Sequence, residues 1–257
     1  MMKIIEQYLC GKVSDDRCED GIVTTPSFVA VIDGSTSKTP RHIHPTLRNG
    51  RYAMLLISDA IRQLPADVSR ETCIQALTDV LHRQYHQVLP PEERLTASAI
   101  IYSDVRREIW MIGDCQCLVD GVLYENGKPS EREHAEKRAR YILAHPDDPD
   151  APEKGRALIV PDLVRSMREG QNKQYAVLDG YPVFLPGVKT IAVERAHEIV
   201  LASDGYPFLK PTLSESEEAL QRQLHDDPQN IHTFLATKGL VAGNRSFDDR
   251  AYIRFRR

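Results

Sequence analysis

Aspartates recur in this sequence at the ends of apolar, strand-like runs. The clearest run is FVAVIDG at 28–34, where Asp33 and Gly34 follow five apolar residues. A single aspartate of this kind is readily explained as a turn former, because Asp and Gly favour the local hydrogen bonds and positive φ angles of turns. Comparable acids occur at four further places, namely Glu19-Asp20 in CEDG, Asp114 in MIGDC, Asp204 in IVLASDG, and Asp248-Asp249 before AYIRF.

Acids at this many strand ends suit a site for hard divalent cations. Such a site needs several carboxylate oxygens, together with carbonyls and water, that converge from separate elements. Strand ends are rigid positions from which these oxygens can be aimed. The sequence therefore predicts that the acids converge and bind metal.

The stretch FVAVIDGSTS also has to be compared with three other motifs that handle phosphate. A haloacid dehalogenase-like phosphatase has its nucleophilic aspartate two residues before Asp33, but that position is Val31. A Walker loop, G-x-x-x-x-G-K-[ST], is not supplied by the residues from Gly34 to Lys38. The D-x-G-T-T loop of actin-like kinases is matched loosely, since no residue separates Asp33 from Gly34, and this alternative predicts ATP binding.

The composition is that of a globular protein. Of the 257 residues, 41% are hydrophobic and 27% charged, and the net charge is −4, so neither disorder nor a nucleic-acid surface is expected. The first apolar stretch is broken by Glu6 and Gln7, which argues against a signal peptide or membrane span and predicts a cytoplasmic protein. The five cysteines are odd in number and are expected to be structural thiols.

The predicted elements favour an α+β layered domain. Apolar residues at helical spacing indicate helices, and β-rich runs bounded by turn residues indicate strands. From residue 96, such runs predict an antiparallel meander, whereas PDDPDAPEKG at 146–155 is expected to be a loop. Helices are predicted at 48–64, 67–88, 130–145 and 158–169, and the first strands at 3–10 and 27–32. One domain is expected over residues 1–257, because no long linker or repeat divides the chain.

Taken in order, the motifs resemble those of the type 2C, metal-dependent protein phosphatases (the PPM family). CEDG resembles the early E-D motif of that family, AVIDGSTS its F-D-G-H-G-G motif, and TASAIIYS its T-A strand. IWMIGDCQCLV resembles the V-G-D-S-R strand, EIVLASDGYPFL the LASDG-W-D motif, and SFDDRAYIRF the closing D-N-x-T strand. The similarity spans essentially the whole chain.

This resemblance implies a four-layer αββα sandwich, in which two antiparallel sheets are flanked by helices. Two Mn²⁺ or Mg²⁺ ions are expected in a cleft at one end. By the pattern of the family, Asp33 bridges both ions and the Gly34 carbonyl binds one of them. Asp204 and Asp248 hold the other.

The resemblance also assigns the remaining acids. Glu19 and Asp20 would bind or orient metal-bound water, and Asp114 with Asp204 would correspond to a third, weaker metal position found in some members. Two cations lower the pKa of a shared water, which serves as nucleophile, and they neutralise charge on the phosphoryl group. No serine or cysteine nucleophile is then required.

The sequence departs from the family at two positions near the expected site. Where the family often has an arginine that binds substrate phosphate, this chain has Asp15, and Arg17 would share the same face if the segment were a strand. Where many members have a histidine after Asp-Gly, this chain has Ser35. His42 or His44 in the next loop would then have to supply any acid catalysis.

Residues 126–180 take the place of the flap that family members carry beside the active site, and they are expected to be largely helical and highly charged. Because substrate choice is expected to depend on this segment, both a phosphoprotein and a small phosphoester stay open as substrates. A phosphatase is the leading hypothesis. The alternative is a catalytically weak relative that binds a partner or phosphoprotein without turnover. Neither nucleic acid nor a membrane is expected as a partner.

Overall fold

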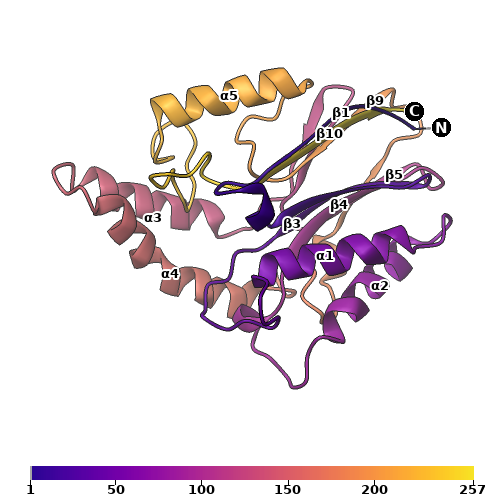
Figure 1. Cartoon of the computed structure of the whole chain (residues 1–257), viewed down its shortest axis with the longest axis horizontal. Coiled ribbons are helices and arrows are strands. Elements are labelled where there is room, and N and C mark those ends of the chain that lie inside the picture. Colours follow the sequence, from indigo (N-terminus) through magenta and orange to yellow (C-terminus); the bar gives the residue numbers. More distant parts are fainter. Residues whose placement is uncertain (1) are drawn as a thin grey trace.

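Two five-stranded antiparallel sheets stack on each other in the computed structural model, which describes residues 2–257 (Figure 1). The first sheet contains, in spatial order, β1 (Lys3–Cys10), β10 (Arg250–Arg256), β9 (Glu198–Ala202), β6 (Gln116–Val119) and β7 (Val122–Tyr124). The second contains β2 (Asp20–Thr24), β3 (Phe28–Gly34), β4 (Ala97–Ser103), β5 (Glu108–Ile112) and β8 (Lys189–Ala192).

Helices cover the outer face of each sheet (Figure 1). α1 and α2 lie on the second sheet, α5 lies on the first, and α3 and α4 pack on each other at one end of the sandwich. Their bounds are α1 Asn49–Arg62, α2 Arg70–His82, α3 Glu131–Leu143, α4 Ala151–Gly170 and α5 Leu213–Asp226. The predicted α+β class and the αββα order of layers are confirmed.

The continuous apolar run of β3 is explained by burial on both of its faces. Val29 and Val31 belong to the core between the two sheets, whereas Ala30 and Ile32 belong to the core under α1 and α2. A strand that is covered on both faces has no polar face to alternate with, so its sequence is apolar throughout. All five cysteines are free and buried, in agreement with the prediction of structural thiols.

The meander predicted from residue 96 is wrong in one respect, because the chain changes sheets in the middle of it. β4 and β5 belong to the second sheet, whereas β6 and β7 belong to the first. The chain crosses at Gly113, whose φ of +93° is readily adopted only by glycine. Asp114 follows directly and therefore lies at the crossing between the sheets.

Antiparallel pairing brings the acidic strand ends to one end of the sandwich. Asp20 begins β2 and lies directly opposite Asp33 at the end of β3. Asp33 in turn pairs with Ser98 near the start of β4. In the other sheet, the end of β9 lies beside the start of β10, which brings Asp204 near Asp248. Strand register, rather than the loops, thus collects these carboxylates.

The segment 126–180 is largely helical, as predicted, but its second helix is longer than expected. α4 begins at Ala151, inside the stretch PDDPDAPEKG that was predicted to be a loop. Pro152 stands in the first turn of this helix, where its missing N–H has no intrahelical partner to lose. Proline at this position is therefore a helix start and not a helix breaker.

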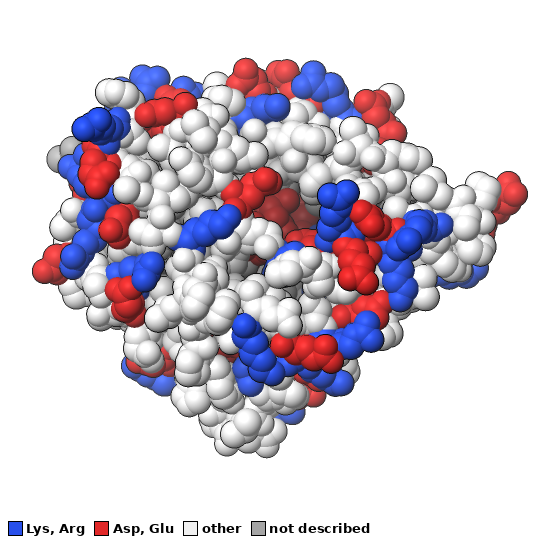
Figure 2. Space-filling model, turned by 180° about the vertical axis from the view of Figure 1, so that it is seen from behind, with Lys and Arg blue, Asp and Glu red and all other residues white. Residues whose placement is uncertain are grey.

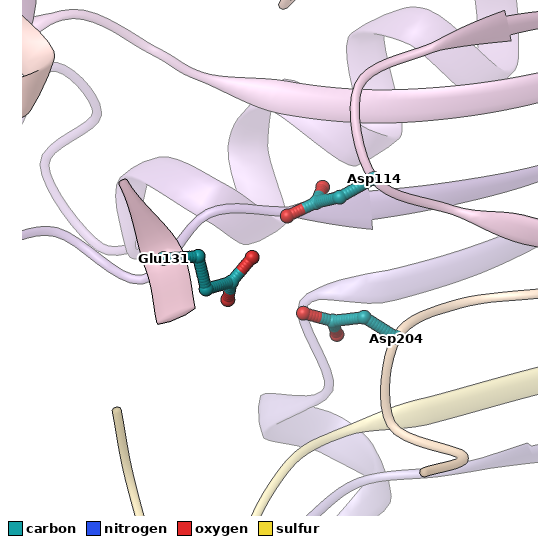
Figure 3. Close-up of side chains that lie close together, drawn as sticks. All are labelled: Asp114, Glu131 and Asp204. Atoms are coloured by element: carbon teal, nitrogen blue, oxygen red, sulfur yellow. The ribbon is translucent and has the colours of Figure 1, made fainter. Parts of the chain in front are cut away.

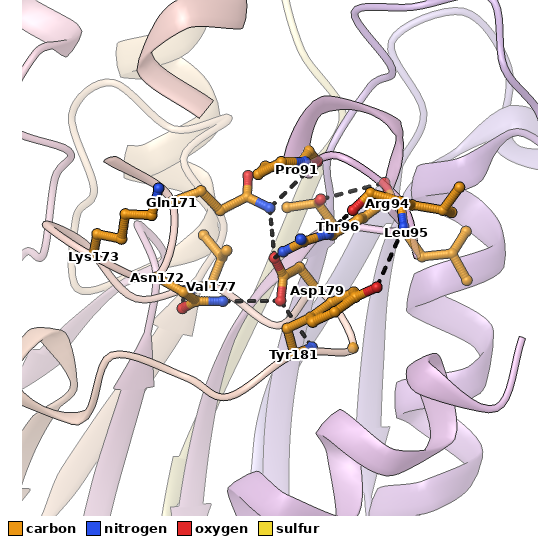
Figure 4. Close-up of polar contacts among 12 residues, drawn as sticks. Pro91, Arg94, Leu95, Thr96, Gln171, Asn172, Lys173, Val177, Asp179 and Tyr181 are labelled. Carbon is orange, nitrogen blue, oxygen red and sulfur yellow. Dashed lines mark hydrogen bonds and ion pairs between the residues drawn. The ribbon is translucent and has the colours of Figure 1, made fainter. Parts of the chain in front are cut away.

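A buried carboxylate ties the chain after α4 to the segment before β4 (Figure 4). Asp179 is fully buried, and its Oδ2 accepts hydrogen bonds from Arg94 Nη1 and Gln171 Nε2, both at 2.8 Å. Its Oδ1 accepts from Asn172 Nδ2 at 2.9 Å and from the Tyr181 N–H at 3.0 Å. We infer that this network holds the C-terminal end of α4 in place.

Candidate active site

A cavity of about 130 Å³ lies at the end of the sandwich where the acidic strand ends meet. The predicted site residues that line it are Asp33, Gly34, Asp114, Asp204 and Asp248. Figure 2 shows a hollow of this kind, with acidic side chains inside it and basic side chains along part of its rim. The residues supplied to the cavity by other segments include Lys38, Lys128, Glu131, His134, Arg156 and Lys238.

Glu19 and Asp20 are almost inaccessible to solvent, at 1% and 2% exposure. Glu19 Oε2 accepts a hydrogen bond from the Thr36 hydroxyl, but Glu19 Oε1 and Asp20 Oδ2 are buried without a hydrogen-bond partner. Burial and repulsion from Asp249 raise the pKa of Asp20 to about 7. Unsatisfied buried carboxylate oxygens are costly, and a cation or ordered water would satisfy them.

Burial and neighbouring acids disfavour the charged form of Asp33. Burial raises its pKa well above the usual range, and repulsion from Asp204, Asp20 and Asp114 adds to the shift. Since the charged form is the one disfavoured, a divalent cation between these groups would relieve the repulsion. The oxygen-only set of donors fits the Mn²⁺ or Mg²⁺ predicted for the site.

Asp114, Asp204 and Glu131 point toward a common centre (Figure 3). One carboxylate oxygen from each lies within 4.8 Å of those of the other two, and among residues 2–257 this is the one triad of ligand atoms that meets that limit. Burial works against ionisation of Asp114, but the ammonium of Lys128 and the hydroxyl of Ser98 lower its pKa overall. Glu131, from the start of α3, was not predicted as a site residue.

Gly34 is required by the close approach of three backbones behind the site. Its N–H donates to the Glu19 carbonyl at 3.0 Å. A Cβ atom at this position would lie 2.2 Å from the Gly50 carbonyl oxygen and 2.6 Å from that of Glu19. The absence of a side chain thus lets β3 end against α1 and places Glu19 beside Asp33.

Lysine ammonium groups pair with carboxylates that were predicted to bind metal. Lys12 Nζ lies 3.1 Å from Asp248 Oδ1 and 3.2 Å from Asp249 Oδ2. Lys238 contacts the other oxygen of Asp248, and Lys128 contacts Asp114. A divalent cation at Asp248 therefore competes with positive charge that the chain itself supplies.

This competition predicts that Lys238→Met binds Mn²⁺ more tightly than the wild type. Removing one unit charge beside Asp248 lowers the electrostatic cost of placing a divalent cation there, and an effect of about tenfold or more in Kd is expected. Isothermal titration of metal-free protein at constant pH measures it. Lys154→Met, which removes an exposed lysine paired with Asp148, is the matched control and is expected to leave Kd unchanged. Equal Kd values for all three proteins would show that Lys238 and the metal do not share Asp248.

The strand geometry assumed for Arg17 was wrong. Residues Asp15–Arg17 form a short 3-10 helix, and the exposed Arg17 is not among the residues that line the cavity. His42 and His44 also do not line it, and His44 Nδ1 instead accepts hydrogen bonds from the backbone N–H groups of Thr46 and Leu47. Ser35 does line the cavity.

The residues that sequence reasoning missed come mostly from outside the acidic motifs. His134, Arg156 and Glu131 belong to the helical segment, where charged residues look like an ordinary solvated surface. Lys38 alone was detectable locally, because it follows the FVAVIDGSTS stretch directly. The others have no signal in the sequence that separates them from their charged neighbours.

No protein-family model matches this sequence, and no curated protein is recognisably similar to it. Solved structures are similar over the full chain. The serine/threonine phosphatase Stp1 from Staphylococcus aureus has a TM-score of 0.51 at 12% identity, with 100% of this chain and 95% of that chain covered. The catalytic domain of the serine/threonine protein phosphatase PstP, in complex with two manganese ions, has a TM-score of 0.50 at 14% identity, with 99% and 97% covered.

A third structure, described as a bacterial serine phosphatase, has a TM-score of 0.51 at 12% identity and covers 100% of this chain and 98% of its own. The fold is therefore that of the bacterial PPM (type 2C) serine/threonine phosphatases, as the motifs implied. At these identities the similarity establishes the fold alone. No helix within residues 2–257 is both long and apolar enough to cross a membrane.

Proposed function

We propose that this chain is a Mn²⁺- or Mg²⁺-dependent phosphomonoester hydrolase that acts on phosphoserine or phosphothreonine in proteins. The observation that carries the proposal is the arrangement of Asp33, Asp204 and Asp248 around one cavity at the strand ends of a PPM fold. The manganese ions of the PstP catalytic domain support the choice of metal.

The donors proposed for two cations are Asp33, the Gly34 carbonyl, Asp204 and Asp248. When bound, these ions would supply a water of lowered pKa and would offset charge on the phosphoryl oxygens. Asp114 and Asp204, joined by Glu131, are proposed to hold a third cation. The buried oxygens Glu19 Oε1 and Asp20 Oδ2, which have no hydrogen-bond partner, support cation binding at this end of the sandwich, because a buried carboxylate oxygen without a partner is costly.

Other residues of the chain would orient the reacting groups. Thr36 donates to Glu19 Oε2 and so fixes the orientation of this buried carboxylate. Ser98 donates to Asp114 Oδ1 and sets the rotation of that carboxylate. Arg17, exposed on its 3-10 turn, is not included in this proposal.

The direct test is hydrolysis of an aryl phosphate and of a phosphothreonine peptide from neutral to alkaline pH. Activity is expected with Mn²⁺ and is expected to disappear when the metal is chelated. A preference for the peptide in kcat/KM supports a protein phosphatase, and the reverse preference supports a small phosphoester as substrate. Absence of turnover, in protein that titration shows to be loaded with Mn²⁺, would refute a hydrolase.

A second function, binding of a phosphoprotein without turnover, has one specific observation in its favour. Lys12 and Lys238 already neutralise Asp248, one of the carboxylates proposed to hold a catalytic cation. Titration discriminates between the two proposals. A chain that takes up no Mn²⁺ or Mg²⁺ at millimolar concentration would favour the binding module.

A further inference from the structure

Among the described residues, two basic side chains that line the cavity have no carboxylate partner. Lys128 and Lys238 are paired with Asp114 and Asp248, but among residues 2–257 no carboxylate oxygen lies within 4.0 Å of the charged nitrogens of Lys38 or Arg156. Their hydrogen bonds go to neutral carbonyls. Lys38 donates to the carbonyl of Thr36, and Arg156 Nη1 donates to that of Thr237 at 2.7 Å.

These two positive charges are also partly withdrawn from water. Lys38 and Arg156 are both half-buried. Burial, together with repulsion from Lys238 and Arg156, lowers the pKa of Lys38 to about 7, and burial lowers the pKa of Arg156 as well. A partly desolvated cation without a counterion is unfavourable, and an anion that enters the cavity would supply the missing charge.

The two residues reach the cavity from elements that are remote in sequence. Lys38 lies in the loop that follows Asp33, whereas Arg156 lies in the second turn of α4. Gly155 allows α4 to pack closely on α3, since a Cβ there would lie 3.1 Å from Ile142 Cγ1. The hydroxyl-bearing residues Ser35, Thr36 and Ser130 line the same cavity and add further hydrogen-bonding capacity.

We propose that Lys38 and Arg156 form an anion subsite that binds the phosphoryl group of a phosphate monoester beside the carboxylate cluster. A guanidinium with several N–H donors and a mobile ammonium suit the oxygens of a phosphate dianion. The subsite would replace the arginine that the family often has at the position of Asp15. This assignment rests on the proposed function for its role in turnover, but the binding itself can be measured without turnover.

Inorganic phosphate is the probe for the first experiment. Its Kd is measured by isothermal titration with metal-free protein, and again with Mn²⁺, for the wild type, Lys38→Met and Arg156→Gln. Each substitution is expected to weaken binding by about 10- to 100-fold, the range for loss of one hydrogen bond to a charged group. Arg156→Lys, which keeps the charge, is expected to recover part of the loss.

Matched controls separate the subsite from general charge effects. Arg165→Gln removes an exposed arginine of the same helix, and Lys154→Met removes an exposed lysine, and both are expected to bind phosphate like the wild type. Circular dichroism and the melting temperature identify any variant that fails to fold. Absence of millimolar phosphate binding to the wild type, or unchanged Kd in both Lys38→Met and Arg156→Gln, would overturn the subsite.

Hydrolysis measured on the same proteins separates this proposal from the proposed function. If the wild type hydrolyses a phosphomonoester but Lys38→Met and Arg156→Gln keep its KM and kcat, the phosphatase stands and the subsite is wrong. If the wild type binds phosphate through these residues but hydrolyses nothing, the subsite stands and the phosphatase is wrong. A rise in KM in both variants, with partial recovery in Arg156→Lys, supports both.

Discussion

Asp33→Asn is expected to lower kcat/KM for phosphomonoester hydrolysis by about 10³-fold or more. The substitution keeps the shape of the side chain but removes the negative charge proposed to bridge two cations. Metal-ion stabilisation of a phosphoryl transition state is worth several kcal/mol, and about 1.4 kcal/mol corresponds to a tenfold change in rate. Steady-state kinetics with saturating Mn²⁺ measures the change, and titration reports the accompanying loss of Mn²⁺ affinity.

The same variant is expected to be at least as stable as the wild type when metal is absent. Burial and neighbouring acids raise the pKa of Asp33, so the folded state holds this proton more tightly than the unfolded state does. The stabilisation that protonated Asp33 gives the folded state is therefore lost as the pH rises from the ordinary pKa range of an aspartate through the raised pKa. The gain in melting temperature of Asp33→Asn over the wild type is expected to be larger at pH 8 than at pH 5.

A matched control for this experiment is Asp59→Asn. Asp59 lies on the exposed side of α1, pairs with Arg62 and is not among the residues that line the cavity. Its activity, Mn²⁺ affinity and melting temperature are expected to match the wild type. Wild-type turnover in Asp33→Asn would contradict the assignment of Asp33 as the bridging carboxylate. A large fall in the stability of the metal-free protein would show that the charge of Asp33 stabilises the fold.

Asp179→Asn is expected to cost about 3 kcal/mol or more of the free energy of unfolding, the lower end of the range for breaking a buried ion pair from one side. Each carboxylate oxygen accepts two hydrogen bonds, so either orientation of the new amide turns its NH₂ toward two donors. Arg94, whose guanidinium lies 3.6 Å from the ring centre of Tyr181, would lose its counterion.

Denaturant unfolding of metal-free protein measures this loss. Asp59→Asn again serves as control, because an exposed ion pair such as Asp59 with Arg62 contributes about 0–1 kcal/mol. A loss in Asp179→Asn no greater than that of the control would show that the network is not an anchor. Because Gln171 both donates to Asp179 and lines the cavity, weaker phosphate binding in Asp179→Asn is also expected.

The fold could be predicted largely from local patterns. The apolar run before Asp33 and the helical spacing at 48–64 match β3 and α1 closely, since burial on one or two faces leaves a direct mark on the sequence. No local sequence pattern indicates that the chain changes sheets at Gly113. A strand that continues in one sheet and a strand that leaves it have the same alternation, so only long-range packing distinguishes them.

The acidic residues of the site could also be predicted from the sequence. Asp33, Asp204 and Asp248 stand at strand ends, and antiparallel register carries strand ends to a common edge whatever the details of the loops. The position of Arg17 was predicted wrongly because the local structure was wrong. The prediction assumed a strand, in which alternate side chains share a face, but the segment forms a 3-10 helix and this alternation does not apply.

By itself, the sequence determined the class of fold and the row of carboxylates, because both follow from short-range periodicity and chain order. Only the tertiary structure decided which cations face those carboxylates. Lys12, Lys128 and Lys238 come from three separate segments, and each long side chain reaches a carboxylate that is not adjacent to it in the sequence. Their pairing depends on how helices and loops pack at the end of the sandwich, and no local pattern of residues encodes that.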